Sequence, residues 1–445
     1  MFKKDFFWGT ATASYQIEGA FNQDGRGLSV WDVFSRWPGK VRDGHNGDIA
    51  CDHYNRYKED VKLMKELGIN AYRFSVSWSR VLPDGIGKVN EKGLDFYDRL
   101  VDELLKNNIT PFMTLFHWDY PYELYRKGGW LNPDSPKWFL EYTKVLCDRL
   151  SDRVQYYMTL NEPQCFIGVG HKWGGHAPGL RLSDYDLLYA VHNTLLAHGE
   201  SVKYIRENAK TKPHIGFAPC GIVAIPSTGN DVDAARRYMF DNSDIGRNAV
   251  WMDPVYLGKY PKEFGEQVGN LPKIDLDADL KTISQPLDFF GCNTYHGEIV
   301  TTDSSGNVIT LRKPVGNTRT AINWHVTPEV LYWGPKLFYE RYQKPVIMTE
   351  NGMANCDTIS FDGKCHDPQR IDYVHRHLLS LKKAAEEGVE VDGYFLWSLL
   401  DNFEWAEGYN ERFGIIYVDY QTQKRTPKDS YYWYKSVIEA NGENL

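Results

Sequence analysis

The feature that most constrains the fold is a series of apolar runs of strand length, separated by segments with the period of an amphipathic helix. Residues 109–116 are almost continuously apolar, which is typical of a parallel strand covered by helices on both faces. Residues 57–67 have helical spacing and end at Gly68, a residue that favours a helix C-terminus. The alternation predicts eight strands, at 6–14, 69–78, 109–117, 154–161, 214–219, 287–295, 345–350 and 391–398.

Eight strands that alternate with helices predict an α/β fold, a single (β/α)8 TIM barrel. No low-complexity linker interrupts the chain, so we expect one catalytic domain over residues 1–445. Stretches rich in Gly, Pro and Asn follow the strands, which predicts long loops over the C-terminal face of the barrel, where such folds carry their sites. Residues 231–286 have no clear pattern. The expected helices are 57–67, 94–107, 136–150, 185–209, 328–342 and 368–387.

The charge and hydropathy of the chain exclude two classes of partner. The net charge is −8, and no basic face is available to neutralise phosphates, which argues against nucleic acid. No stretch approaches the roughly 18 apolar residues that span a membrane. Lys3-Lys4 followed by aromatic residues resembles the start of a signal peptide, but Asp5 interrupts it. Nothing in the sequence determines the oligomeric state.

The seven cysteines follow no disulfide or zinc-binding spacing. A reducing compartment explains them most simply, so we expect a cytoplasmic protein. Cys356, Cys365 and His366 form the only local cluster, and a ligand set in that loop stays open as an alternative. No other ligand pattern occurs, and the sequence predicts neither a metal nor a cofactor.

Two glutamates occupy settings that suit a catalytic pair. Glu162 and Glu350 each follow a short apolar run of strand type, and each is soon followed by Pro or Gly. A carboxylate at the end of a buried strand is held rigidly and partly desolvated, so one such group can stay protonated while another is ionised. Such a pair is the minimum apparatus for cleaving a glycosidic bond. The alternative is that both are strand-end partners of salt bridges.

Other strand ends are also polar or aromatic. A barrel would bring these strand ends together at its mouth. The resulting pocket would contain amides, a histidine, an arginine and acids flanked by tryptophans, which suits a polyhydroxylated ring. The aromatic content of 14%, with 14 Trp, fits stacking against the apolar faces of sugars. The residues at or near the strand ends are Gln16, Glu18, Arg73, Trp78, His117, Trp118, Asn161, Asn293, Tyr295, Asn351, Trp397, Glu404 and Trp405.

Several blocks of the sequence resemble glycoside hydrolase family one. They are residues 6–19, 72–80 and 393–420 together with Asn-Glu-Pro at 161–163 and Thr-Glu-Asn-Gly at 349–352. They occur in the family's order, and the resemblance covers essentially the whole chain.

The resemblance implies a retaining exo-β-glycosidase, most often a β-glucosidase. Such an enzyme removes terminal β-glucosyl residues from cello-oligosaccharides or aryl and alkyl β-glucosides through a covalent glycosyl-enzyme. By motif, Glu162 would be the acid/base and Glu350 the nucleophile. The residues expected to bind the sugar are Gln16, His117, Asn161, Tyr295, Trp397 as the stacking platform, Glu404 and Trp405. Arg73 and Asn293, with Tyr295, would surround the nucleophile, and Trp324 is a candidate aglycone contact.

One departure and two alternatives accompany the resemblance. Gln164 stands where family members often carry an aromatic residue, which leaves the leaving-group side of the pocket open. A 6-phospho-β-glycosidase would share the architecture, but Glu404, Trp405 and Glu407 offer two acids and an indole where a phosphate would sit. A non-catalytic carbohydrate- or partner-binding barrel is the third interpretation, and loss of either glutamate would have favoured it.

Overall fold

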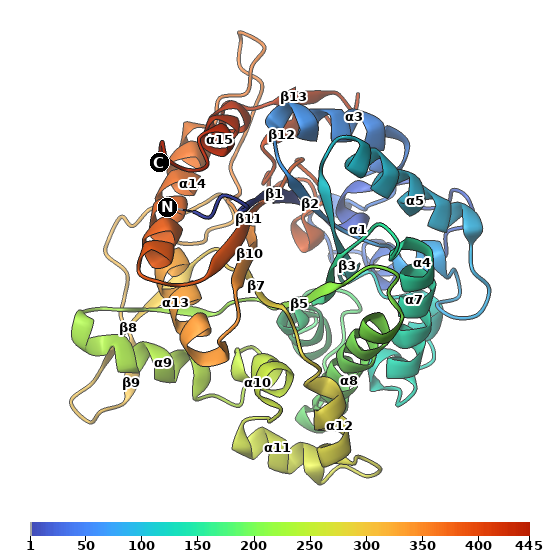
Figure 1. Cartoon of the computed structure of the whole chain (residues 1–445), viewed down its shortest axis with the longest axis vertical. Coiled ribbons are helices and arrows are strands. Elements are labelled where there is room, and N and C mark those ends of the chain that lie inside the picture. Colours follow the sequence, from blue (N-terminus) through green and yellow to red (C-terminus); the bar gives the residue numbers. More distant parts are fainter. Residues whose placement is uncertain (1) are drawn as a thin grey trace.

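The computed structural model describes residues 2–445, and at its centre is a closed barrel of eight parallel strands (Figure 1). The strands are hydrogen-bonded in the order β1-β11-β10-β7-β5-β4-β3-β2. Each lies within or one residue beyond a predicted segment, which confirms the (β/α)8 prediction. They are β1 (Phe7–Ala11), β2 (Ala71–Ser75), β3 (Thr110–Phe116), β4 (Tyr156–Asn161), β5 (His214–Ala218), β7 (Phe289–Asn293), β10 (Val346–Asn351) and β11 (Val391–Trp397).

A ring of helices covers the barrel strands, and so the strands are apolar on both faces (Figure 1). Every residue of β2 and β10 is buried. The helix Glu91–Lys106 buries Leu94, Tyr97, Val101 and Leu104, the spacing of one helix face. The long helices correspond to the six predicted ones: α3 (His53–Leu67), α5 (Glu91–Lys106), α7 (Ser135–Leu150), α8 (Asp184–Asn208), α13 (Val330–Tyr342) and α14 (Pro368–Glu386).

The start of the chain differs from the expectation. The first strand ends at Ala11 instead of residue 14, because the Ser14 backbone N–H donates to Ser75 Oγ at 2.8 Å instead of to a strand. Gln16 therefore lies on the short helix α1 (Ser14–Ile17), not at a strand end. Trp78 likewise begins α4 (Trp78–Val81) and is fully buried in the core.

The segments that follow the strands contain secondary structure of their own. The stretches 220–230 and 296–326, expected as loops, contribute a small separate sheet in the order β6-β8-β9. Residues 231–286, which showed no pattern, form four helices. The additional elements are α2 (Val30–Phe34), α6 (Tyr122–Tyr125), β6 (Val223–Pro226), α9 (Val232–Phe240), α10 (Ala249–Leu257), α11 (Lys262–Gly269), α12 (Leu276–Ile283), β8 (Gly297–Thr302), β9 (Val308–Thr310), β12 (Ile416–Val418), β13 (Arg425–Pro427) and α15 (Asp429–Glu439).

The two ends of the described chain lie on the same side of the molecule (Figure 1). Trp8 Nε1 donates to Asn441 Oδ1 at 2.9 Å, and the Tyr434 hydroxyl on α15 donates to the Gly9 carbonyl at 3.0 Å. The last helix therefore closes the outer ring over the first strand. Within residues 2–445, no helix has the length and apolar character required to cross a membrane.

Candidate active site

Glu162 and Glu350 line one cavity of about 280 Å³ at the carboxyl ends of the strands. Glu162 directly follows β4, and Glu350 is the penultimate residue of β10. Their exposed fractions are only 7% and 3%. The structure thus brings together the two carboxyl groups that the sequence singled out.

A continuous set of hydrogen bonds joins the two glutamates. Arg73 Nη1 donates to Glu350 Oε1 at 2.6 Å, and its Nη2 donates to Asn161 Oδ1 at 2.6 Å. Asn293 Nδ2 donates both to Asn161 Oδ1 and to Glu162 Oε1, each at 2.9 Å. Because β2, β4, β7 and β10 provide these residues, the barrel itself fixes the position of one carboxyl group relative to the other.

The environments of the two carboxyl groups differ. Burial raises the pKa of Glu162 to about 7, and the negative charge of Glu350 adds to this rise. Burial also raises the pKa of Glu350, but Arg73 and the Tyr295 hydroxyl, which donates to Oε2 at 2.7 Å, oppose it. Glu350 is therefore the better stabilised as an anion, and Glu162 is the group that holds a proton near neutral pH.

His117 presents a neutral ring to the cavity. Asn161 Oδ1 accepts from Arg73 and Asn293, so Asn161 Nδ2 must be the donor to His117 Nε2, at 3.0 Å. The hydrogen of the neutral ring is consequently on Nδ1. Burial and the charge of Arg73 lower the pKa of His117 well below its ordinary value. Among residues 2–445, His117 Nδ1 has no partner, so it is a buried donor available to a ligand.

On the same side, Gln16 and Glu404 form a second polar group. Gln16 Nε2 donates to the Phe403 carbonyl at 2.8 Å and to Glu404 Oε2 at 3.4 Å, while Gln16 Oε1 has no partner within the protein. Burial raises the pKa of Glu404 to about 8, and the charges of Glu350 and Glu162 contribute. Trp397 and Trp405, each 3% exposed, form apolar walls of the same cavity.

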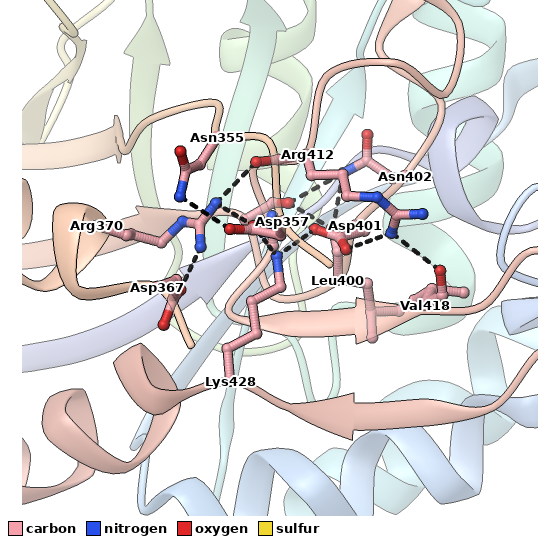
Figure 2. A network of polar contacts seen from close by, with 12 residues as sticks. Asn355, Asp357, Asp367, Arg370, Leu400, Asp401, Asn402, Arg412, Val418 and Lys428 are labelled. Carbon is pink, nitrogen blue, oxygen red and sulfur yellow. Dashed lines mark hydrogen bonds and ion pairs between the residues drawn. The ribbon is translucent and has the colours of Figure 1, made fainter. Parts of the chain in front are cut away.

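A buried network of ion pairs anchors the loop that carries Glu404 and Trp405 (Figure 2). Lys428 Nζ donates to Asp357 at 2.5 Å and to Asp401 at 2.7 Å. Asn402, the next residue, accepts from Gln16 Nε2 at 3.0 Å. The network therefore sets the position of the polar group that faces the cavity. Its other ionic members are Asp367, Arg370 and Arg412.

Comparison with known proteins agrees with this geometry. The sequence profile of Glycosyl hydrolase family 1 matches residues 1–443. The chain belongs to glycosyl hydrolase family 1. It is 47% identical over 447 residues to the 1,4-beta-D-glucan glucohydrolase of Thermotoga neapolitana, covering 99% of each chain. It is also 47% identical to Beta-glucosidase A of Thermotoga maritima, covering 99% of this chain and 98% of the relative. The structure of the T. maritima beta-glucosidase in complex with glucoimidazole superimposes with a TM-score of 0.91 at 47% identity, over 99% of both chains.

Three residues of this family 1 site have a left-handed backbone without being glycine. They are Trp118 at φ 77°, Glu162 at φ 43° and Trp405 at φ 48°. Non-glycine residues adopt this region at a cost of about 1–3 kcal/mol each, and such positions cluster at functional sites. The cost is compensated by local bonds, such as the Trp118 Nε1–H to Asn161 carbonyl bond of 3.0 Å.

Trp324 was predicted as a candidate aglycone contact. It lines the main cavity and a neighbouring cavity of about 160 Å³, and its ring lies 5.2 Å from that of Tyr295.

Gln164, the departure from the family pattern, bonds to the backbone of Cys220. Its side chain donates to the Cys220 carbonyl at 2.9 Å and accepts from the Cys220 backbone N–H at 3.2 Å. Gln164 therefore ties the loop after β4 to the loop after β5.

Two residues of the site, Cys165 and Thr349, were missed as contributors to it. Cys165 Sγ donates to Glu162 Oε2 at 3.1 Å, and Thr349 Oγ1 donates to Asn293 Oδ1 at 2.6 Å. Trp118, which the sequence placed at a strand end, lines the cavity. The signal for Cys165 was its spacing of three residues from Glu162, which brings two side chains together once a helix begins there. Thr349 was marked by its place beside Glu350.

The loop cluster of Cys356, Cys365 and His366 does not form a ligand set. Cys356 is exposed and Cys365 is buried, while His366 pairs with Asp362 at 3.1 Å and Asp429 at 2.6 Å. Within residues 2–445, no group of three or more His, Cys, Asp or Glu side chains is arranged to hold a metal ion.

Proposed function

We propose that this family 1 glycoside hydrolase is a β-glucosidase that removes terminal β-D-glucosyl residues with retention of configuration. One observation carries the proposal. The bonds through Arg73, Asn161 and Asn293 hold an anionic Glu350 and a protonated Glu162 at the wall of one cavity. The two relatives described above carry the names 1,4-beta-D-glucan glucohydrolase and Beta-glucosidase A, in agreement with glucoside hydrolysis.

In the first step, a Glu350 oxygen attacks the anomeric carbon as the bond to the leaving oxygen breaks, and Glu162 gives its proton to that oxygen. Arg73 and Tyr295 hold Glu350 ionised and oriented. The product is a covalent glycosyl-enzyme ester. Formation of the ester removes the charge of Glu350, one of the causes that raise the pKa of Glu162.

In the second step, Glu162 acts as a base because its pKa has fallen. It takes a proton from water, and the water oxygen attacks the anomeric carbon. The ester bond breaks, Glu350 leaves as a carboxylate, and the sugar is released with its original configuration.

The sugar is held by groups that the protein leaves unpaired. Gln16 Oε1 and His117 Nδ1 have no protein partner, which matches the hydroxyls of a neutral sugar. In this proposal Asn161, Glu404 and Trp405 bind further hydroxyls, Trp397 stacks under the ring and Trp324 contacts the leaving group. Asn293 and Tyr295 act around the nucleophile.

An unphosphorylated substrate is favoured over a 6-phosphate. A phosphate monoester carries roughly 1.5 to 2 negative charges near neutral pH. In the described chain, the lining of the cavity contains four acids, Glu162, Glu350, Glu404 and Glu407, and neither Lys nor Arg, so a phosphate would add negative charge without a cation to balance it. The substrate is in our proposal a small carbohydrate such as an aryl β-glucoside or a cellobiose-like disaccharide.

Kinetics on 4-nitrophenyl β-glucoside, β-galactoside, β-fucoside and β-glucoside 6-phosphate tests the proposal. We expect kcat/KM for the glucoside to exceed that for its 6-phosphate by at least about a hundredfold, or roughly 2.7 kcal/mol of transition-state discrimination. NMR of early products should show the β-anomer first. Equal use of the phosphate, or the α-anomer first, would overturn the proposal.

We further propose that residues 1–445 act as one catalytic domain in the cytoplasm. The bond between Trp8 and Asn441 supports a single unit, because it joins the first strand to the end of the chain. All seven cysteines are free thiols, in agreement with a reducing compartment.

A further inference from the structure

The carboxyl group of Glu162 is held through both of its oxygens. Asn293 Nδ2 donates to Oε1 at 2.9 Å and Cys165 Sγ donates to Oε2 at 3.1 Å. The amide orientation of Asn293 is defined, because its Oδ1 accepts from Thr349 Oγ1 at 2.6 Å and its Nδ2 also donates to Asn161. Oε1 is therefore permanently an acceptor, and the proton of the neutral acid must lie on Oε2.

Cys165 thus touches the one oxygen that gains and loses the proton. The thiol donates to the carboxylate form of Glu162, but it cannot donate to an oxygen that carries its own hydrogen in the same direction. The contact therefore favours the state in which Glu162 has given up its proton. That state develops in the transition state in which the leaving oxygen is protonated.

The local chain geometry keeps the thiol in this place. The Glu162 backbone carbonyl accepts from the Cys165 backbone N–H at 2.8 Å, at the start of the π-helix Gln164–Lys172. Gln164 binds both backbone polar groups of Cys220, whose thiol lies beside that of Cys165. The Asn293 carbonyl accepts from the Gly221 backbone N–H at 2.8 Å. One framework consequently holds both donors to the Glu162 carboxyl group.

We propose that Cys165 is a positioning residue of the acid/base step: its thiol contacts Oε2, the proton-bearing oxygen of Glu162, and favours release of that proton to the leaving group. This inference rests on the proposed function of Glu162. The remaining charged and titratable groups that face Glu162 come from other elements and are unchanged by substitution at 165. They are Arg73, His117, His176, Cys220, Cys292, Tyr295, Glu350 and Glu404.

The direction of the effect follows from the charge. The bond from Cys165 acts to lower the pKa of Glu162, whereas burial and Glu350 raise it. Its loss in Cys165→Ala should therefore move the basic limb of the pH profile of kcat/KM upward. Because a thiol is a weak donor, we expect a movement of about 0.5 pH unit. Cys165→Ser retains a donor and should restore most of the wild-type profile.

The leaving group separates this role from general damage to the fold. A weaker and less well oriented acid slows cleavage of methyl β-glucoside, which we expect to fall about tenfold in kcat/KM at pH 6. Formation of the glycosyl-enzyme from 2,4-dinitrophenyl β-glucoside needs no proton and should be unaffected. Cys356→Ala, at an exposed thiol outside the cavity, is the matched control and should alter neither rate nor profile.

Two results would overturn the inference: an unmoved basic limb in Cys165→Ala, or equal losses on the two leaving groups. A measurement independent of turnover completes the test. The carbon-13 shift of the Glu162 carboxyl, assigned by its loss in Glu162→Gln, should titrate at higher pH in Cys165→Ala than in the wild type. An unchanged titration also contradicts the role of Cys165. Failure of the wild type to hydrolyse any β-glucoside contradicts the proposed function instead.

Discussion

Two buried groups of charged side chains lie close to each other in this protein, and their charge balance differs. The network in Figure 2 combines three carboxylates with three cations: Asp357, Asp367 and Asp401 with Arg370, Arg412 and Lys428. The active-site cavity gathers Glu162, Glu350 and Glu404 around Arg73 as the cation bonded to Glu350. One region is balanced and the other has an excess of acid.

The difference in charge balance gives the acids of the two regions different pKa values. Burial acts to raise the pKa of Asp357, but Arg370 and Lys428 outweigh it and hold the pKa below the ordinary value. In the cavity the result is the opposite: burial raises the pKa values of Glu162 and Glu404 to about 7 and about 8, and the charges of neighbouring acids add to the rise. The network with balanced charge anchors a loop. The cavity with more acids than cations keeps carboxyl groups protonated near neutral pH, as an acid catalyst requires.

The largest expected effect comes from removing the nucleophile. Glu350→Ala should lower kcat for 4-nitrophenyl β-glucoside by at least about 10⁴-fold, because no glycosyl-enzyme can form. Added azide should restore turnover and yield the α-glucosyl azide, whereas Glu162→Ala should yield the β-azide. The same azide product from both variants would contradict the assignment of roles.

The second effect should appear in the balanced network. Lys428→Met leaves Asp357 and Asp401 buried without their shared cation, so we expect the free energy of unfolding to fall by about 3–5 kcal/mol. Denaturant unfolding measures this loss. The control is Lys62→Met, which removes an exposed pair with Glu66 and should cost about 0.5 kcal/mol or less. If both variants lose a similarly small free energy of unfolding, the stability of the network does not depend on its charge balance.

The smallest effect concerns the pH dependence of stability. The folded-state pKa of Glu404 lies above its ordinary value of 4.5, so the folded protein holds this proton more tightly than the unfolded chain. Its contribution to stability is complete below pH 4.5 and is lost as the pH rises to about 8. Asp357, with its lowered pKa, contributes in the opposite sense and loses stability only in acid, below about pH 4.

Glu404→Gln tests this linkage. Unfolding at pH 5 and pH 8.5 should show a smaller decrease in stability for the variant than for the wild type, by about 1–2 kcal/mol, since the side chain is partly exposed. Activity should fall because a sugar contact is lost. If the pH dependence of the variant's stability equals that of the wild type, the pKa of Glu404 is not raised in the folded protein.

The barrel could be predicted to a large extent, and the errors have physical causes. The continuously apolar strands and the helices with one apolar face, such as α5, were evident from their periodicity. The first strand was predicted to be too long. Its end depends on the hydrogen bond from Ser14 to Ser75, and a contact between residues so far apart in sequence leaves no signal in the local pattern. The small β6-β8-β9 sheet was missed for the same reason.

Residue order by itself determined the eight strands, the place of Glu162 and Glu350 at strand ends, and, through family resemblance, the set of residues around them. Tertiary structure alone decided which oxygen of Glu162 carries the proton, because Asn293 donates to Oε1, and it alone brought Cys165 to the other oxygen. It also decided the contrast between balanced and unbalanced charge. Composition counts acids and bases over the chain, but a pKa depends on which of them share a buried space, and only the closed barrel brings those side chains together.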